Sequence, residues 1–330
     1  MIIFGGLLLL TLYFLPEGLT GLLVAAVQRT PLKALLDPQG SLENPSPISS
    51  STEPVIAKQH TSNSNIPLLE TKDLTIAFGG LIAVNKLNLR VMGGQIHALI
   101  GPNGSGKSTT VNLLTGVYRQ TSGSILFRNE PLAGLPNRIS RAGIARTFQN
   151  VALFGHMTVL ENVLVGLHHT FRGGLVHVLL NTKHARKEEW DARARAIALL
   201  DFVGLANLAY TQARNLPYGK QRLLEIARAL AQNPAIIILD EPAAGLTHTE
   251  ISVVDALMKK MKSLGLAILL IEHHMDLVMA SSDEITVLDF GQKIAGGLPE
   301  EIQRNPEVIR AYLGTSVDES NPGKLGASHA

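Results

Sequence analysis

The sequence predicts an α/β domain built around a mostly parallel sheet. Short runs of apolar and β-branched residues alternate with segments of helical spacing, a pattern typical of parallel strands joined by helices. One run leads into a glycine-rich loop followed by a helical pattern, and another is apolar throughout and ends in two carboxylates. The runs occupy residues 95–100, 124–127, 235–239, 267–271 and 285–288.

The composition is that of a globular protein with a sizeable core. The chain has 330 residues, of which 45% are hydrophobic and 17% charged, and its formal net charge is only +2. This balance excludes an extensively disordered chain and gives no support to nucleic-acid binding, which relies on a basic surface. Because the sequence contains no cysteine, disulfides, thiolate metal sites and thiol catalysis are excluded.

Residues 1–36 form the most apolar part of the chain, and we expect a membrane segment there. Residues 2–15 carry no charge. The first 15 positions would nevertheless span only about 22 Å as a helix, less than the ~30 Å hydrocarbon core of a bilayer. Three interpretations are open: a secretory signal, although no basic residue precedes the run; a helix buried in a core; and the last part of a spanning helix. In the last case, Arg29 and Lys33 would place everything after them in the cytoplasm.

Changes in composition predict three further segments. Residues 37–67 are dominated by Ser, Thr, Pro, Asn and Gln, which predicts a disordered linker. Residues 68–314 carry the α/β pattern, interrupted by charged stretches of helical spacing that predict a helical subdomain at about 155–230. Residues 315–330 are small and polar and predict a disordered tail.

The glycine-rich loop, residues 101–109, fits the pattern G-x4-G-K-[ST] and lies between a predicted strand and a predicted helix. Its glycines allow successive N–H groups to face one point, and the positive end of the following helix adds to the attraction for phosphate. We expect Lys107 to reach the β- and γ-phosphates of a nucleotide and the Ser108 hydroxyl to bind Mg²⁺. An incidental lysine in a glycine-rich turn would not explain the flanking elements. The expected nucleotide-binding residues of this phosphate loop are Gly101, Asn103, Gly104, Ser105, Gly106, Lys107, Ser108 and Thr109.

The apolar run 235–239 leads into Asp240 and Glu241. A strand that is apolar throughout is buried on both faces of a parallel sheet, and its C-terminal end lies at the edge where ligands bind. Because neighbouring strand residues point to opposite sides, we expect Asp240 to hold the magnesium shell and Glu241 to polarise the attacking water. Either acid alone would more simply be a solvated strand end, but together with the phosphate loop they predict nucleotide hydrolysis.

Five motifs resemble, in order and spacing, an ATPase of the ABC type over residues 68–313. The motifs are the phosphate loop, the Thr-Phe-Gln-Asn stretch 147–150, the segment 216–230, the acidic strand end and the Ile-Glu-His-His stretch 271–274. The resemblance implies a P-loop NTPase fold in which an antiparallel β subdomain and a helical subdomain accompany the core sheet, with ATP and Mg²⁺ as cofactors. It also implies that Phe78 stacks on adenine, that Gln149 senses metal and water, and that His273, next to a second histidine, contacts the γ-phosphate.

The signature segment, residues 216–221, reads LPYGKQ where the wider ABC family has LSGGQ. Pro217 offers neither a hydroxyl nor an N–H group, so two possible donors to a phosphate are missing. The N–H groups of Tyr218 and Gly219 and the N-terminus of the next helix remain. The geometry of the family implies that this segment serves the nucleotide of a second ATPase, a paralogue or another copy, in a head-to-tail dimer.

The LPYG sequence and the stretch 304–314 resemble the ATPases of branched-chain amino-acid importers. Thr247 and His248 depart from that subfamily, which usually has Asn-Pro in this loop at the dimer seam. The run 14–23 resembles the end of the matching permease, so we expect residues 1–36 to be a permease-like remnant.

The resemblance thus implies an ATP-hydrolysing subunit at the cytoplasmic face of the inner membrane. The implied partners are permease subunits, a second ABC ATPase and, indirectly, an extracytoplasmic substrate-binding protein, and no nucleic acid is expected. Two alternatives are an ABC ATPase of a lipid or lipopolysaccharide exporter and a non-transport ABC ATPase acting on DNA or ribosomes. LPYG and the stretch 304–314 argue against the first. The lack of a long coiled-coil insertion or of a tandem ATPase domain, together with the small net charge, argues against the second.

Overall fold

The computed structural model describes residues 66–149, 151–168 and 183–313. Contacts divide the chain into two units, Met1–Ser51 with Gly173–Arg186, and Thr52–Arg172 with Lys187–Ala330. Of the described residues only 183–186, the start of one helix, belong to the first unit, and all described strands belong to the second. The membrane segment 1–36, nearly all of the linker 37–67 and the tail 315–330 lie outside the described residues.

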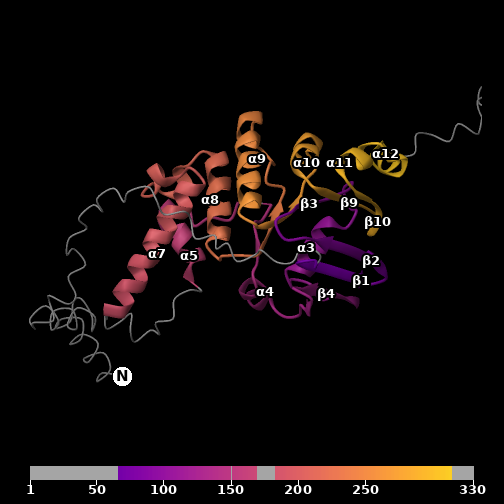
Figure 1. Cartoon of the computed structure of the whole chain (residues 1–330), viewed down its shortest axis with the longest axis horizontal. Helices are drawn as coiled ribbons and strands as arrows, with labels where there is room; N and C mark the ends of the chain where they lie inside the picture. Colours follow the sequence, from indigo (N-terminus) through magenta and orange to yellow (C-terminus); the bar gives the residue numbers. More distant parts are fainter. Residues whose placement is uncertain (1–65, 150, 169–182, 314–330) are drawn as a thin grey trace, which may run out of the picture. The chain divides into compact units, whose positions relative to one another are not determined.

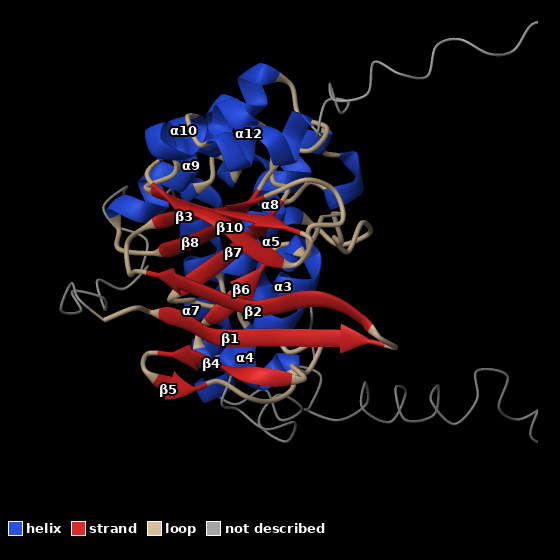
Figure 2. Cartoon of the chain, turned by 90° about the vertical axis from the view of Figure 1, so that its right-hand side faces the viewer, coloured by secondary structure: helices blue, strands red, loops and turns tan. Residues whose placement is uncertain are grey.

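A six-stranded sheet forms the centre of the fold, with strand order β10-β9-β3-β8-β7-β6 (Figures 1 and 2). Five of its strands run parallel, and β10 alone is antiparallel to its neighbour β9. This confirms the mostly parallel sheet that the apolar runs predict. The strands are β3 (Ile96–Ile100), β6 (Ile144–Arg146), β7 (Ile236–Asp240), β8 (Ala267–Ile271), β9 (Glu284–Asp289) and β10 (Gln292–Gly297).

A second, antiparallel sheet has the strand order β2-β1-β4-β5. Its strands are β1 (Leu69–Phe78), β2 (Leu81–Val91), β4 (Ser122–Phe127) and β5 (Glu130–Pro131). It confirms the antiparallel sheet that the resemblance implies. The strand β1 alternates buried and exposed residues over much of its length, as expected for a sheet with one face on a core and one face in water.

Helices connect the strands, and those between residues 155 and 230 follow one another without an intervening strand in the described part of this stretch. These are α5 (Val159–Gly166), α7 (Lys183–Phe202) and α8 (Tyr218–Leu230), with 3₁₀ turns at Ala206–Leu208 and Ala213–Asn215. The remaining helices are α3 (Lys107–Leu114), α4 (Pro136–Ala142), α9 (His248–Ser263), α10 (Met275–Ser281), α11 (Pro299–Gln303) and α12 (Pro306–Leu313).

Two hydrophobic cores share the central strands. Ile237 and Leu239 of β7 pack into the core that includes α5, α7, α8 and α9, whereas Ile236 and Ile238 pack into the core that lies against the antiparallel sheet and α3. The residues of β3 divide in the same way. Burial on both faces explains why the run 235–239 is apolar throughout instead of alternating, and why every residue of β3 is buried.

Among the described residues, no helix combines the length and the apolar character needed to cross a bilayer.

Candidate functional site

The phosphate loop joins the C-terminal end of β3 to the start of α3, as the sequence predicts. Two of its glycines are required sterically. Gly101 has φ 150°, and a Cβ atom there would collide with the carbonyl oxygen of Leu288. Gly106 has φ 100°, and its Cβ would lie 2.6 Å from the carbonyl oxygen of Ala83. A side chain at either position would therefore displace the loop.

The turn between β9 and β10 supports the phosphate loop from one side. The Gly291 N–H donates to the carbonyl oxygen of Ser105 at 3.0 Å, and the Gly291 carbonyl accepts from the Asn85 N–H of β2 at 2.8 Å. A single turn residue thereby links the loop to the antiparallel sheet.

The ammonium group of Lys107 lies over its own loop. Its Nζ donates to the carbonyl oxygens of Gly101 at 2.7 Å and Pro102 at 2.9 Å. Burial lowers the pKa of Lys107, and the negative charges of Glu241 and Asp240 partly oppose that shift. The acidic strand end, although far from the phosphate loop in the sequence, therefore lies close enough to Lys107 to act on its charge.

The rest of the loop presents polar groups with different exposure. Ser105 is buried, and its hydroxyl oxygen has no hydrogen-bond partner among the described residues. A Cβ placed on Gly104 would meet nothing within 4 Å, so space is open above the tip of the loop. Asn103 and Ser108 are exposed, and Thr109 is half-buried in the first turn of α3.

Asp240 is the last residue of β7, and its side chain is almost fully buried. Its Oδ2 accepts a hydrogen bond from Nη2 of Arg146 at 2.8 Å. Nη1 of the same arginine donates to Oδ1 of Asn112 in α3, also at 2.8 Å. Arg146, at the end of β6, thereby ties the acidic strand end to the helix that follows the phosphate loop.

Glu241 departs from the expected strand geometry. The strand β7 ends at Asp240, and Glu241 adopts a left-handed backbone conformation with φ 48°. The expectation that simple strand alternation sets its direction was therefore wrong, because alternation applies only while the extended backbone continues.

The left-handed turn at Glu241 brings three predicted residues together. Nε2 of Gln149 donates to Oε2 of Glu241 at 2.8 Å, and Nδ1 of His273 lies 4.0 Å from Oε1 of the same carboxylate. The ring centroid of His274 lies 5.3 Å from that of His273, but no contact of His274 with Glu241 is described. The geometry thus favours His273 over its neighbour as the histidine of the site.

Glu272 supports this group from beneath. Its buried carboxylate accepts from the backbone N–H groups of Ala243 at 2.8 Å, His273 at 2.9 Å and His274 at 3.1 Å. One carboxylate therefore fixes both the loop after Glu241 and the histidine segment.

Phe78 closes β1 and is 44% exposed, as a residue that stacks on a base must be. Its ring meets the ring of Tyr118 edge-on, with a centroid distance of 5.3 Å. Among the described residues, no contact of this aromatic pair with Lys107 or Glu241 is found.

The signature segment lies at the start of α8, where Pro217 is the N-cap residue and contributes no side-chain cap. Tyr218 is exposed, whereas Gly219 is buried against Glu250, and its N–H helps to lower the pKa of that carboxyl after the larger effect of the Thr247 backbone and hydroxyl. In the single chain, Glu250 therefore lies beside one of the two N–H groups expected to serve a second nucleotide.

Arg146 and Glu272 were missed by the sequence analysis. Arg146 precedes the Thr-Phe-Gln-Asn stretch by one residue, and Glu272 lies inside the Ile-Glu-His-His stretch. The position of these two residues was the signal that could have identified them. Each is charged, lies close to a predicted site residue in the sequence and adjoins an apolar strand.

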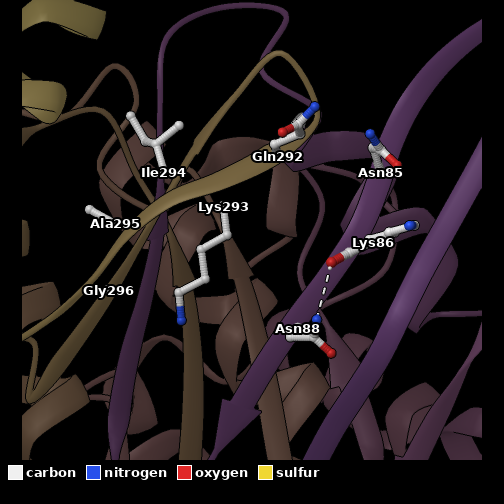
Figure 3. Close-up of a pocket in the computed structure, with 8 residues that line it drawn as sticks. All are labelled: Asn85, Lys86, Asn88, Gln292, Lys293, Ile294, Ala295 and Gly296. Carbon is white, nitrogen blue, oxygen red and sulfur yellow. Dashed lines mark hydrogen bonds between the residues drawn. The ribbon is translucent and has the colours of Figure 1, made fainter.

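A cavity of about 510 Å³ lies elsewhere, between β2 and β10 (Figure 3). Asparagines, lysines and a glutamine dominate its lining, and none of the predicted site residues is among them. Its lining residues are Asn85, Lys86, Asn88, Gln292, Lys293, Ile294, Ala295 and Gly296.

Comparison with known proteins agrees with this arrangement. Residues 84–244 match the ABC transporter family, and residues 292–318 match the branched-chain amino acid ATP-binding cassette transporter family. The chain is 49% identical over 250 residues to the high-affinity branched-chain amino acid transport ATP-binding protein LivG of Escherichia coli (strain K12), an alignment that covers 75% of this chain and 98% of LivG.

Solved structures are similar over the same extent. The ADP conformation of MJ1267, an ATP-binding cassette of an ABC transporter, has a TM-score of 0.66 at 32% identity, covering 76% of this chain and 99% of that chain. A dimeric post-hydrolysis state of the ATP-binding cassette MJ0796, bound to ADP and Pi, has a TM-score of 0.59 at 26% identity, covering 70% and 98%.

The family matches start at residue 84, so they lend no support to a permease-like remnant at residues 1–36. They do confirm the resemblance drawn from the motifs, including its branched-chain subfamily, and they weaken the exporter and non-transport alternatives. The chain belongs to the ATP-binding proteins of ABC transporters, in their branched-chain amino acid group, and is an ABC transporter ATPase.

Proposed function

We propose that this chain hydrolyses ATP to drive the import of branched-chain or related amino acids through a membrane permease. The observation that carries the proposal is the gathering of Gln149, Glu241 and His273 beside the phosphate loop. The 49% identity to LivG, which extends over nearly all of that protein, supports the choice of substrate class.

The phosphate loop fits a nucleoside triphosphate. Its tip is open above Gly104, and the Ser105 hydroxyl is a buried polar group without a partner among the described residues. Lys107 already bonds two carbonyl oxygens of the loop, so its ammonium group is held where phosphate oxygens would accept from it. Phe78, with Tyr118 against its ring, would provide the face on which adenine stacks.

The side chains also fit Mg²⁺. The hydroxyl of Ser108, the amide oxygen of Gln149 and the carboxylate of Asp240 are hard oxygen donors, and Mg²⁺ in nucleotide sites is commonly held by one or two carboxylates together with substrate phosphates. When bound, the ion would neutralise charge on the phosphates.

The chemistry itself falls to Glu241. A water placed between this carboxylate and the terminal phosphate would lose its proton to Glu241 as it attacks phosphorus. Gln149 and His273 lie on either oxygen of the carboxylate, so they can orient it and the water. The products are ADP and inorganic phosphate.

The working unit would contain two ATPase domains in a head-to-tail dimer, at the cytoplasmic face of the membrane beneath the permease subunits. Tyr218 and Gly219 would then face the nucleotide of the second domain, which is either a paralogue or another copy. The dimeric state of the related cassette MJ0796 supports this arrangement. An extracytoplasmic substrate-binding protein would act with the permease. The interpretation of residues 1–36 as a permease-like remnant stays a prediction.

Substitution of the central carboxylate tests the catalytic part of the proposal. Glu241→Gln should lower kcat about 100-fold or more, because the amide cannot accept the proton of water. It should also trap ATP and a stable dimer, as judged by filter binding and size-exclusion chromatography. Lys107→Ala should instead weaken ATP binding. The same acid-to-amide change at Glu300, in the first turn of α11, is the control, and equal turnover by Glu241→Gln and the parent would remove the assigned role.

Transport provides the test of the substrate class. In Escherichia coli cells that lack LivG, expression of this chain should restore uptake of radiolabelled leucine, and the Lys107→Ala variant should not. Restored nucleotide hydrolysis in the membrane fraction without leucine uptake would contradict the branched-chain assignment while leaving the ATPase intact.

A further inference from the structure

A buried ion pair in α8 lies outside the group of side chains assigned to nucleotide hydrolysis. Arg222 is 0% exposed and Glu225 is 1% exposed, and Nη1 of the arginine donates to Oε2 of the glutamate at 2.9 Å. The two residues are one turn apart on the face of α8 that points into the protein. Burying two charges costs free energy that a well-packed apolar pair would avoid, so stability alone is a weak reason for such a pair.

The guanidinium of Arg222 makes further bonds, all of them to the backbone of site segments. It donates to the carbonyl oxygens of Phe148 at 2.8 Å, Gln149 at 2.9 Å and Glu241 at 3.3 Å. Oε1 of Glu225 accepts from the Phe148 N–H at 3.1 Å. One ion pair therefore holds the backbone of two segments, and these segments carry the two side chains that bond each other at the site.

The same helix also begins with the signature segment. Arg222 lies three residues after Gly219, within the first turns of α8. A displacement of the Gln149 segment would thus be transmitted through the guanidinium to the helix start. The planar fork of an arginine, with several donors in fixed directions, suits this bridging of several carbonyl oxygens, which a lysine cannot reproduce.

We propose that Arg222, held in place by Glu225, is a positioning residue that couples the two nucleotide sites of the dimer. It fixes the backbone of Gln149 and Glu241 at this chain's own site and ties it to the helix that presents Tyr218 and Gly219 to the other site. This inference rests on the proposed function, because it takes both sites as ATP sites. The ion pair thereby connects the two sites, which neither the phosphate loop nor the acidic strand end does.

The double variant R222M/E225L tests the link, because it removes both charges together and leaves no buried charge unpaired. Arg222→Lys is the second variant, which keeps the charge and loses the fork. The matched control is R193M/E189L, the same chemical change at the exposed Arg193–Glu189 pair of α7. Thermal unfolding of the parent and of each variant identifies the temperatures at which all of them are folded, and the readouts below are taken at those temperatures.

The first readout needs no nucleotide. Hydrogen exchange of the Phe148 amide should become about tenfold faster or more in R222M/E225L, because this N–H loses its acceptor, and should be unchanged in the control. Unchanged protection of Phe148 in the folded double variant would overturn the proposed link whatever the protein does with ATP.

The second readout separates positioning from binding. In both Arg222 variants we expect the affinity for a fluorescent ATP analogue to stay within about threefold of the parent, since the phosphate loop is intact, while kcat falls about tenfold or more. In a Glu241→Gln background, the ATP-stabilised dimer that keeps the ion pair should persist to about tenfold lower protein concentration than the dimer that lacks it. Parental kcat and parental dimer affinity in a folded R222M/E225L variant would overturn the proposal. Failure of the proposed function would instead be seen in the parent, as a lack of ATP binding.

Discussion

At the scale of single residues, the site depends on how buried charges are paired. Asp240 is nearly inaccessible to solvent and has the guanidinium of Arg146 as its ionic partner, while Arg146 is in turn held by Asn112. The buried charge of Glu272 is instead stabilised by three backbone N–H groups that donate to its carboxylate. In both cases the carboxylate organises a segment of the site as well as satisfying its own charge.

Removal of one partner of such a pair should be costly. Arg146→Met leaves the carboxylate of Asp240 buried without a counter-charge, so we expect the free energy of unfolding to fall by about 3 kcal/mol. Urea unfolding followed by circular dichroism measures this. The double variant R146M/D240N should recover most of the loss, because no buried charge then remains.

A surface pair provides the contrast. Arg90 and Glu70 form an ion pair at 2.8 Å in which the arginine side chain is 72% exposed. Arg90→Met should change the free energy of unfolding by less than about 1 kcal/mol, since water screens this pair. A loss as large as that of Arg146→Met would contradict the argument from burial.

His97 makes stability depend on pH. Burial, with a smaller effect of Lys293, lowers the pKa of His97 to about 3, while the unfolded chain has a pKa near its ordinary 6.5. Between these values the unfolded state binds a proton that the folded state does not, so stability falls as the pH drops below about 6.5, by up to about 1.4 kcal/mol per pH unit. Urea unfolding at a series of pH values between 7 and 5 gives the free energy of unfolding at each pH. This free energy should fall less steeply with decreasing pH in His97→Gln than in the parent. His156→Gln, at an exposed turn, should keep the parental slope.

At the scale of elements, the loop after Glu241 ends at the capped start of α9. Thr247 is the N-cap residue of this helix and forms a reciprocal capping box with Glu250, in which the Thr247 N–H and hydroxyl both donate to Oε2 at 2.9 Å. Threonine is a favoured N-cap residue, so the departure from Asn-Pro at this position has a local structural role.

Loss of the cap should be measurable. Thr247→Ala should lower the free energy of unfolding by about 1 kcal/mol, because the Glu250 N–H loses the hydroxyl that accepts from it. Ser252→Ala, which removes a hydroxyl bonded to a carbonyl in the same helix, should change it by less than about 0.5 kcal/mol. Equal effects of the two substitutions in urea unfolding would show that the cap is unimportant.

Elements were more predictable from the sequence than the contacts between them. The strand, loop and helix around Lys107 follow from adjacent residues, and the sequence analysis located them. Asp240 with Arg146, Ala243 with Glu272, and Gln149 with Arg222 lie 94, 29 and 73 positions apart in the chain. Such pairings depend on the order of strands in the sheet, which no local pattern contains. The left-handed conformation of Glu241 is of the same kind, because no local pattern in the sequence marks the residue at which the extended backbone of β7 ends.

At the scale of the whole molecule, the site lies where two cores meet. β3 and β7 send alternate side chains into each core and end in the phosphate loop and the acidic pair. Nucleotide binding at these strand ends should therefore stabilise the entire unit. With ATP and Mg²⁺ at about 100 times Kd, the free energy of unfolding should rise by about 2.7 kcal/mol, seen as a higher Tm. Lys107→Ala should show no such rise at the same ATP concentration, and an equal rise would place the nucleotide elsewhere.

The turn between β9 and β10 bears on how this protein can be labelled. Phe290 is 85% exposed there, so the hairpin tip looks like a convenient place to insert an epitope tag or a fluorescent reporter. Its neighbour Gly291, however, is bonded both to the phosphate loop and to β2. An insertion at that tip would weaken nucleotide binding in an otherwise intact protein. Reporters should therefore be placed at other exposed positions.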